Sequence, residues 1–414
     1  MKFKADGKVQ KIFESERKRQ IEGLELIPSE NYVSKNVLEA LGSIFTNKYS
    51  EGYPKKRYYG GNQFIDEAEL LAIERAKKLF KTTYHVNVQP YSGSPANIAV
   101  FFGLLDFGDK IMGMKLSQGG HLTHGHKVNF SGRAYKVVQY GVRKSDERLD
   151  YKEIEKIALK EKPKIIICGA TAYPREIDFK KFASIAKTAK AILMADISHI
   201  AGLIVAGVHN SPFGYADIIT TTTHKTLRGP RSAIIFCREK YAKDIDRAVF
   251  PGLQGGPHDH VTLAKAIAFG EALKPSFKNY GEQIVKNAQV LARILSEGGL
   301  RVVSDGTDNH LILVDLTTIG VAGKQAEKWL EDVNISVNKN TIPYDERSPF
   351  DPSGIRLGTP AVTSRGMKGG DMKKVGEFII RTIKSGGDKK ELNRIRKEVI
   401  SFTKKFPVPG ITDN

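Results

Sequence analysis

The sequence predicts an α/β protein built on a mostly parallel, doubly wound sheet, followed by a smaller α+β domain. Between residues 85 and 240, short β-rich runs alternate with helical stretches. Several of these runs are continuously apolar, as strands are when helices cover both faces of a parallel sheet. After Pro275 the alternation gives way to longer helices around an apolar strand, and we therefore expect a second domain there.

The elements follow in order along the chain. Residues 7–22 place Val9, Ile12 and Phe13 at helical intervals and stop before Gly23, which predicts an amphipathic N-terminal helix. Strands are predicted at residues 85–88, 110–114, 135–140, 164–168, 191–195, 216–220 and 232–237. Helices are predicted among them at residues 95–105, 150–160 and 179–190. A long helix, a strand at 311–316, another helix and a terminal helix from 367 onward complete the prediction.

Length and composition describe a globular protein of more than one domain. A chain of 414 residues exceeds what one ordinary core supports. We expect an N-terminal helix or arm at residues 1–30, a large domain at 31–275 and a small C-terminal domain at 276–414. Apolar residues make up 40% of the chain, and no apolar run approaches the roughly 18 residues of a membrane span.

The net charge of +19 raises the question of a nucleic-acid partner. The lysines are spread along the chain without a compact basic block that carries interleaved aromatics, so no specific nucleic acid is expected. Steering of anionic ligands is a simpler use for this charge. Cys168 and Cys237 each end an apolar strand and are expected to be buried free thiols, which suits a reducing cytoplasm.

Residues 216–231 are the most informative stretch. A short apolar strand runs into four threonines and delivers Lys225 onto a polar loop. His224 precedes this lysine, and Arg228 and Arg231 follow it, so the setting favours the uncharged, nucleophilic amine that a Schiff-base lysine needs. An ordinary surface lysine is the alternative, and the assignment depends on finding the rest of a cofactor site.

A lysine-tethered aromatic aldehyde cofactor needs an anion for its ring nitrogen, a stacking group and a phosphate cup. The strand at 191–195 runs into Asp196, a carboxylate suited to keeping a ring nitrogen protonated, although a helix cap is its alternative role. Residues 91–97 follow a strand and open a helix, and such a turn exposes backbone N–H groups to an anion. The glycine cluster at 250–257 is either a plain loop or a second close backbone approach to a phosphate.

Residues 119–126 contain His121, His124 and His126. Their spacing matches no zinc template and no cysteine accompanies them, so no metal is expected. An aromatic stacking role for one of the rings is the preferred interpretation.

Two further segments carry chemistry. Residues 47–61 combine four tyrosines, a carboxylate and a double glycine, which is a high density of proton-transfer groups for a structural loop. Arg356 lies between a glycine and a turn. A guanidinium is a natural bidentate partner for a substrate carboxylate, with an ordinary surface ion pair as the alternative.

Together these residues closely resemble the serine hydroxymethyltransferases, a family of aspartate-aminotransferase-like (fold type I) enzymes that use pyridoxal phosphate. The resemblance runs from residues 26–32 to residues 359–363 and covers most of the chain, and residues 220–231 are its most specific motif. It implies an aspartate-aminotransferase-like large domain that binds the cofactor. The segment 172–178 resembles the archaeal branch.

The resemblance also implies a role for each site residue. Lys225 would carry pyridoxal phosphate as a Schiff base, Asp196 would pair with the pyridine nitrogen and His121 would stack on the ring. The other implied cofactor residues are Ser92, Gly93 and Ser94 at the phosphate, His199 beside the ring, and Tyr49, Gly255 and Gly256 from across a dimer interface. The other implied catalytic residues are Glu51 as acid/base group, with Tyr59, Thr222 and His224. Ser29 and Arg356 would bind the substrate carboxylate near Glu51 and Tyr59, and Leu116, Gly120, Leu122 and Asn340 would line a pterin site.

The implied reaction is the reversible conversion of L-serine and a reduced pterin into glycine and the one-carbon-loaded pterin, in a cytoplasmic homodimer with shared active sites. Gln118 and Tyr344 depart from frequent family residues, so the choice between tetrahydrofolate and a methanopterin-type carrier stays open. The alternative is a pyridoxal-phosphate aldolase that cleaves threonine-like 3-hydroxy amino acids without a pterin, and Glu51 and the pterin residues speak against it. A rival of another class is an RNA-binding protein with a relict site.

Overall fold

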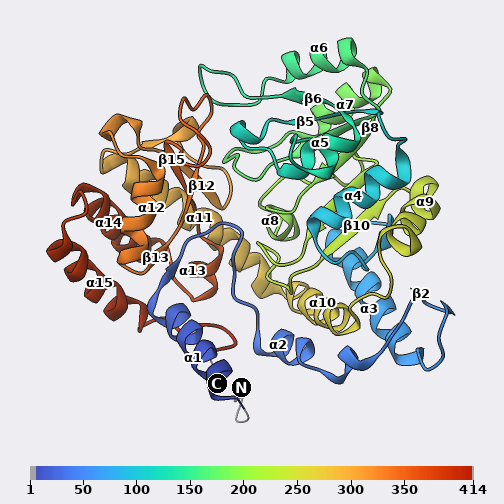
Figure 1. Ribbon diagram of the computed structural model, residues 1–414, viewed down its shortest axis with the longest axis horizontal. Helices are drawn as coiled ribbons and strands as arrows, with labels where there is room; N and C mark the ends of the chain where they lie inside the picture. The colour runs from blue at the N-terminus through green and yellow to red at the C-terminus, as the bar shows by residue number, and fades with distance from the viewer. Residues whose placement is uncertain (1–5, 413–414) are drawn as a thin grey trace. The chain divides into compact units, whose positions relative to one another are not determined.

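The computed structural model describes residues 6–412, which form two compact units. Unit 1 combines the residues up to Lys35 with the chain from Gln283 onward, and unit 2 is the continuous stretch Asn36–Glu282. Each unit has its own sheet and its own helices (Figure 1).

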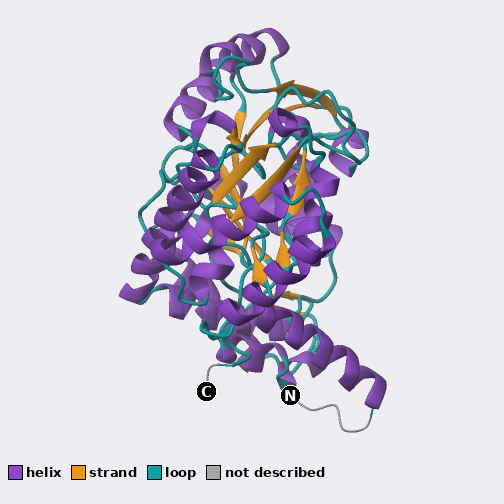
Figure 2. Ribbon diagram, turned by 90° about the vertical axis from the view of Figure 1, so that its left-hand side faces the viewer, coloured by secondary structure: helices purple, strands orange, loops and turns teal. Residues whose placement is uncertain are grey.

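The seven-stranded sheet of unit 2 confirms the predicted doubly wound architecture. Its strands are β4 (His85–Asn87), β5 (Lys110–Met114), β6 (Lys136–Tyr140), β7 (Ile165–Gly169), β8 (Ile192–Asp196), β9 (Ile218–Thr222) and β10 (Ala233–Cys237). Their order in the sheet is β4-β10-β9-β8-β7-β5-β6. The pairs from β9 through β6 are all parallel, whereas β10 is antiparallel to both β4 and β9. Every residue of β7, β9 and β10 is buried, as expected for strands with helices on both sides (Figure 2).

Some helices of unit 2 begin where a short polar side chain caps them. Asp150 accepts hydrogen bonds from the backbone N–H groups of Lys152 and Glu153, and Asp178 accepts one from Lys181. The helices are α2 (Lys35–Leu41), α3 (Gln63–Phe80), α4 (Gly93–Leu104), α5 (Phe130–Ala134), α6 (Tyr151–Glu161), α7 (Phe179–Ala189), α8 (Ala201–Val205), α9 (Ala242–Arg247) and α10 (Asp259–Ala272). Shorter turns are η1 (Ile44–Asn47), η2 (Leu116–Gln118), η3 (Leu122–His124), η4 (Glu239–Tyr241) and η5 (Ala248–Leu253), and β2 (Gly52–Tyr53) pairs with β3 (Lys56–Arg57). The long helix α11 (Pro275–Glu297) includes the division between the units.

Unit 1 is an α+β unit around a four-stranded antiparallel sheet. Its strands are β11 (Arg301–Val302), β12 (Leu311–Asp315), β14 (Asn338–Asn340) and β15 (Gly354–Gly358), in the order β11-β12-β15-β14, with a separate parallel pair of β1 (Leu24–Glu25) and β13 (Ile335–Ser336). Its helices are α1 (Gly7–Glu22), α12 (Gly323–Asp332), α13 (Pro360–Ser364), α14 (Gly369–Lys384) and α15 (Lys389–Thr403), with the turns η6 (Val303–Asp305) and η7 (Thr317–Ile319). Apolar residues of β1, α11, β12, β15, α14 and α15 share one buried core.

The first helix of unit 1 occupies the predicted residues 7–22, but its apolar face does not pack as a core face does. None of its residues is buried, and Ile12 is 71% exposed. The end of the helix is instead fixed by Arg365, which directly follows α13 and is 2% exposed. Its guanidinium donates to the carbonyl oxygens of Gly23 at 2.7 Å, Ile21 at 3.1 Å and Gln20 at 3.4 Å.

The same guanidinium reaches the last helix of the chain. Nη2 of Arg365 donates to the carbonyl oxygens of Thr403, the last residue of α15, at 2.8 Å and of Phe406, three residues beyond it, at 2.9 Å. The final carbonyl groups of a helix have no intrahelical partner and carry a partial negative charge. One buried cation therefore caps the carboxyl ends of both α1 and α15.

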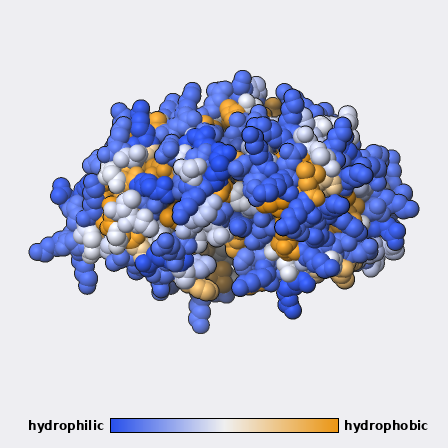
Figure 3. All heavy atoms as spheres, turned by 90° about the horizontal axis from the view of Figure 1, so that it is seen from above, coloured by the Kyte–Doolittle hydropathy of each residue, from blue (hydrophilic) through white to orange (hydrophobic). Residues whose placement is uncertain are grey.

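Cys168 in β7 and Cys237 in β10 are buried free thiols, as predicted. Burial raises the pKa of both groups, to about 12 for Cys237. Among the described residues, no helix combines the length and the apolar character needed to cross a membrane. The face of the molecule seen in Figure 3 is mostly hydrophilic, with scattered apolar patches.

Candidate active site

Asp196, the last residue of β8, is a buried carboxylate with an unusual number of donors. Its Oδ2 accepts hydrogen bonds from Nδ2 of Asn97 at 2.9 Å and Nε2 of His124 at 3.1 Å. Its Oδ1 accepts one from the backbone N–H of Ser198 at 3.0 Å. Burial by itself would raise the pKa of Asp196, but the hydrogen bond and charge of His124, with the charge of His121 and the Ser198 hydrogen bond, hold that pKa well below its usual range. The carboxylate is therefore ionised at neutral pH and held in one orientation.

A chain of hydrogen bonds joins this carboxylate to His121. Nδ1 of His121 lies 2.7 Å from Oγ1 of Thr123, and the same hydroxyl accepts from Nδ2 of Asn97 at 2.8 Å. The rings of His121 and His124 pack edge to face with centroids 5.7 Å apart. His121 is half-buried whereas His124 is 1% exposed. His121, which is predicted to stack on the cofactor ring, is thus held beside Asp196, which is predicted to pair with the nitrogen of that ring.

The predicted phosphate residues lie at the N-terminus of α4. Ser92 precedes the helix without capping it by its own side chain, and Gly93 and Ser94 form its first turn. A Cβ atom on Gly93 would lie 2.7 Å from Cγ2 of Thr222. The space for any side chain at Gly93 is therefore already filled by the end of β9. A helix N-terminus with a bare glycine offers backbone N–H groups and positive potential to an anion.

Lys225 lies on the loop that follows β9 and is 9% exposed. This loop is bound to the loop that follows β8, because Oγ1 of Thr226 donates to the carbonyl oxygen of His199 at 2.9 Å and accepts from the backbone N–H of Gly202 at 3.0 Å. Thr222 donates its backbone N–H to Oγ of Ser198 at 3.1 Å. The parallel strands β8 and β9 thus deliver the carboxylate and the lysine to one edge of the sheet, where ligands of such sheets bind.

His224, directly before Lys225, is a neutral imidazole at physiological pH. Burial lowers its pKa to about 3, and the charges of Lys225 and Arg231 act in the same direction. Its Nδ1 is buried and has no hydrogen-bond partner within the described part of the chain.

Glu51, Tyr49, Tyr59, Gly255 and Gly256 form a second group of predicted residues, which we call the tyrosine cluster. The Tyr49 hydroxyl donates to Oε1 of Glu51 at 3.3 Å, and the rings of Tyr49 and Tyr59 meet edge to face at 5.4 Å. The negative charge of Glu51 is the main cause that raises the pKa of Tyr49. A Cβ atom on Gly255 would lie 3.1 Å from Oε1 of Glu51, and one on Gly256 would lie 3.7 Å from the Tyr49 ring. Tyr49 is 56% and Tyr59 is 51% exposed, so both present much of their surface outward.

Three of the predicted pterin residues share the loop between β5 and α5 with His121. Leu116 is half-buried in η2 and Leu122, in η3, is 41% exposed. Gly120 donates its backbone N–H to the carbonyl oxygen of Lys115 at 2.9 Å, and a Cβ atom there would lie 2.0 Å from the carbonyl oxygen of Met114. Only glycine therefore allows this tight turn.

The remaining predicted residues lie in unit 1. Arg356 is the central residue of β15, is 8% exposed, and donates from Nε to Oδ1 of Asn338 at 3.0 Å. Burial lowers its pKa to about 10, so it stays charged at neutral pH. Asn340 lies on the same neighbouring strand, β14, opposite Gly354.

Ser29 belongs to a turn that packs on the end of β15. The backbone N–H of Gly358 donates to the carbonyl oxygen of Leu26 at 2.7 Å, and a Cβ atom on Gly358 would lie 2.5 Å from Cα of Pro28. Gly358 is two residues beyond Arg356, so unit 1 brings the turn of Ser29 to the strand of the arginine.

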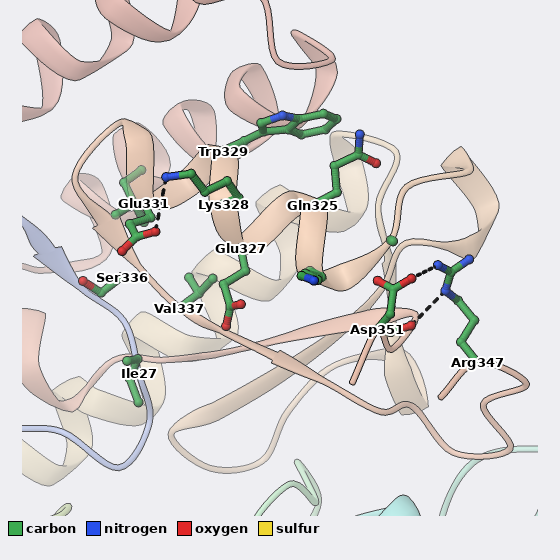
Figure 4. Close-up of a pocket in the computed structure, with 13 residues that line it drawn as sticks. Ile27, Gln325, Glu327, Lys328, Trp329, Glu331, Ser336, Val337, Arg347 and Asp351 are labelled. Atoms are coloured by element: carbon green, nitrogen blue, oxygen red, sulfur yellow. Dashed lines mark hydrogen bonds and ion pairs between the residues drawn. The ribbon is translucent and has the colours of Figure 1, made fainter. Parts of the chain in front are cut away.

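A cavity of about 870 Å³ in unit 1 lies beside α12 and is lined by none of the predicted residues (Figure 4). Several of its charges are paired: Arg347 with Asp351, Lys328 with Glu331 at 3.6 Å, and Glu327 with Lys339 at 2.8 Å. This hollow therefore contributes nothing to the candidate site.

Asn97 and His124, which hold Asp196, were missed as functional residues by sequence reasoning. An asparagine inside the apolar helix α4 is a usable signal, because a buried amide requires a hydrogen-bond partner. His124 was grouped with the other histidines as a possible metal ligand. Within residues 6–412, no group of three or more His, Cys, Asp or Glu side chains could hold a metal ion.

The strand-end residues fit a pyridoxal-phosphate cofactor. The ionised, buried carboxylate of Asp196 suits a protonated pyridine nitrogen. Gly93, against which Thr222 packs, leaves the backbone N–H groups at the start of α4 open to a phosphate. Lys225 lies on the neighbouring loop, and His121 offers an aromatic face.

Comparison with known proteins agrees with this chemistry. Residues 3–379 match the family model described as serine hydroxymethyltransferase. A serine hydroxymethyltransferase of Acidothermus cellulolyticus is 56% identical over 412 residues, which cover 98% of this chain and 96% of that protein.

Proposed function

Because the chain belongs to the serine hydroxymethyltransferase family, we propose that it interconverts L-serine and glycine and transfers the one-carbon unit to a reduced pterin. The observation that carries the proposal is the ionised Asp196 at the edge of the sheet where the loop of Lys225 begins. Bound there, pyridoxal phosphate supplies an electron sink for the charge that develops when the hydroxymethyl group leaves.

Each residue around the cofactor has a distinct task. Lys225 tethers and releases the cofactor, and Asp196 keeps the pyridine nitrogen protonated. The backbone of Ser92, Gly93 and Ser94 binds the phosphate, and His121 stacks on the ring. Thr222, His199 and His224 complete the pocket. Because His224 is neutral, it adds no positive charge beside the amine of Lys225.

Proton transfer falls to the tyrosine cluster, and we propose that this cluster serves the site of a second copy of the chain. The support is exposure: Tyr58 is 73% and Phe64 is 64% exposed, and Tyr49 and Tyr59 are exposed as well. Large exposed aromatic side chains are typical of a homodimer interface. In that arrangement Glu51 acts as acid or base, and Tyr49, Gly255 and Gly256 complete the partner's phosphate site.

Unit 1 is proposed to hold the substrate carboxylate. Arg356 remains charged although it is buried, and the hydroxyl group of Ser29 belongs to a turn on the same strand end. Leu116, Gly120, Leu122 and Asn340 are proposed to line the pterin site. The buried free thiols support a reducing cytoplasm as the location.

Borohydride reduction followed by peptide mass spectrometry tests the central assignment. We expect a pyridoxyl adduct on the peptide of Lys225, and an adduct elsewhere would contradict the assignment. Serine cleavage measured with tetrahydrofolate and with tetrahydromethanopterin identifies the carrier. Full-rate serine turnover without any pterin would favour a threonine-type aldolase instead.

A complementation experiment tests the shared site. Lys225→Ala and Glu51→Gln subunits, each inactive as a homodimer, are mixed in equal amounts and allowed to reassociate. If the tyrosine cluster serves the partner, half of the dimers are hybrids with one complete site, and activity returns to about one quarter of wild type. If each chain uses its own Glu51, no activity returns.

A further inference from the structure

Lys265, in the middle of α10, is a buried amine that the proposed reaction does not use. It is 1% exposed, and its Nζ donates to the carbonyl oxygen of Val88 and, at 3.0 Å, to Oγ of Ser232. Burial lowers the pKa of Lys265 to about 7, against the opposing charge of Glu69. Burying an ammonium group costs several kcal/mol, and an apolar side chain of the same size would fill the space without that cost.

Both acceptors of Lys265 lie next to the residues proposed to bind the cofactor. Val88 directly follows β4 and is four residues before Ser92. Oγ of Ser232 in turn donates to the carbonyl oxygen of Pro90 at 3.0 Å. The amine thus holds the segment 88–90, directly before the phosphate loop, at two points.

Ser232 also holds the loop of Lys225. Its carbonyl oxygen accepts the backbone N–H of Thr223 at 3.0 Å, two residues before Lys225. Ser232 therefore links the segment before the phosphate loop to the loop of the tethering lysine, and it accepts a hydrogen bond from Lys265.

Glu69, whose charge acts on Lys265, connects the same network to the loop of Glu51. Glu69 accepts from Nη2 of Arg57 at 2.6 Å and from Nε2 of Gln89 at 2.9 Å. Nη1 of Arg57 donates to the carbonyl oxygens of Ser50 at 2.8 Å and Gly52 at 2.7 Å, on either side of Glu51.

We infer that Lys265 is a positioning residue for the cofactor: through Val88 and Ser232 it fixes the spacing between the phosphate donors at 92–94 and the amine of Lys225. The inference rests on the proposed function, which places the cofactor between these loops. Lys265 itself touches neither substrate nor cofactor. Its removal should therefore weaken cofactor binding by more than it changes stability.

Two variants test the inference. Lys265→Met keeps most of the side-chain volume and removes the hydrogen-bond donor. Ser232→Ala removes the hydroxyl group that accepts from Lys265 and donates to Pro90. The dissociation constant of pyridoxal phosphate from the apoprotein is measured by equilibrium dialysis, with hydrogen exchange at the amides of residues 91–94 as a second readout. We expect Lys265→Met to raise the constant about tenfold, or 1.4 kcal/mol, and to speed exchange. Ser232→Ala should raise it less, and the effect of the double variant should be smaller than the two single effects combined, because both variants remove the contact between Lys265 and Ser232.

Phe269→Leu, at a fully buried apolar position of the same helix, is the matched control for destabilisation alone. Its melting temperature should fall while its affinity for pyridoxal phosphate stays within about twofold of wild type. Affinity within twofold of wild type for Lys265→Met, or an equal loss in the control, overturns the inference. If Lys265→Met does not fold, Ser232→Ala decides by the same criterion. A wild-type protein that forms no adduct on Lys225 would refute the proposed function, whereas normal wild-type binding with unchanged variants refutes only the role of Lys265.

Discussion

Replacing Arg365 by methionine should destabilise unit 1 by about 3–5 kcal/mol. The substitution keeps most of the side-chain length and removes every donor. Five carbonyl oxygens, at the ends of α1 and α15, then lose their shared partner.

The magnitude follows from these contacts. A hydrogen bond to a charged group contributes about 1.5–3 kcal/mol. Nη2 donates to three of the five oxygens and Nη1 to two, so the group is equivalent to two or three full hydrogen bonds. Water can reach some of the carbonyl groups after the substitution. The expected loss of unfolding free energy is therefore at the lower end of the sum over these two or three hydrogen bonds. Arg365→Lys keeps the charge with a poorer fit to the two helix ends and should lose about half as much.

Urea denaturation followed by circular dichroism measures the loss, and hydrogen exchange shows where it falls. Amides of α1 and α15 should lose protection together, since one cation caps both helices. Arg394→Met is the matched control: Arg394 lies on α15 with its side chain 72% exposed and, among residues 6–412, its ion pairs are with Glu391 and Glu398 on the same helix. Its stability should stay within about 0.5 kcal/mol of wild type. A loss below 1 kcal/mol for Arg365→Met would refute the double-cap explanation.

Three other predictions concern the site. Asp196→Asn removes the negative charge and replaces one acceptor oxygen, which faces the donors of Asn97 and His124, by an N–H group. We expect kcat to fall by at least about 1000-fold while the cofactor dissociation constant changes less than tenfold. Equal losses in kcat and in cofactor affinity would contradict a role of Asp196 in the chemical step. His224 has a folded pKa of about 3 against 6.5 when unfolded, so the unfolded chain binds more protons between these values and stability falls as the pH is lowered. From pH 6.5 to 4 the loss should be about 3 kcal/mol larger in wild type than in His224→Gln, measured by urea midpoints, and identical slopes would exclude this group as the cause. Gly93→Ala forces a Cβ to 2.7 Å from Thr222 and should weaken pyridoxal-phosphate binding at least tenfold. Gly370→Ala, at a glycine with open space around it, should leave binding unchanged. Normal binding of pyridoxal phosphate to Gly93→Ala in equilibrium dialysis would show that the end of this helix is not the phosphate site.

The strands of unit 2 and the position of Asp196 were predictable because they depend on local pattern. An apolar run that ends in a carboxylate identifies a strand end whatever surrounds it. The antiparallel direction of β10 was not predicted, although the sequence carried a signal. Only residues 223–232 separate β9 from β10, and a parallel crossover needs a dozen or more residues.

The residues that hold the site were hidden for a different reason. Asn97 and His124 meet Asp196 across 99 and 72 positions of sequence, and Lys265 reaches Val88 across 177. No periodicity or turn rule brings such residues together, because their contacts exist only once the sheet has formed. The roles of the candidate site residues, Lys225 and Asp196 included, remain predictions.

The placement of the cysteines and of the tryptophan gives each unit its own natural reporter. Trp329, the single tryptophan of the chain, packs against the core of unit 1, whereas both cysteines are buried in the sheet of unit 2. With their pKa values raised, the thiols hold almost no reactive thiolate until the sheet opens. Tryptophan fluorescence therefore follows the unfolding of unit 1, and the rate of thiol alkylation follows the opening of unit 2, in the unaltered chain.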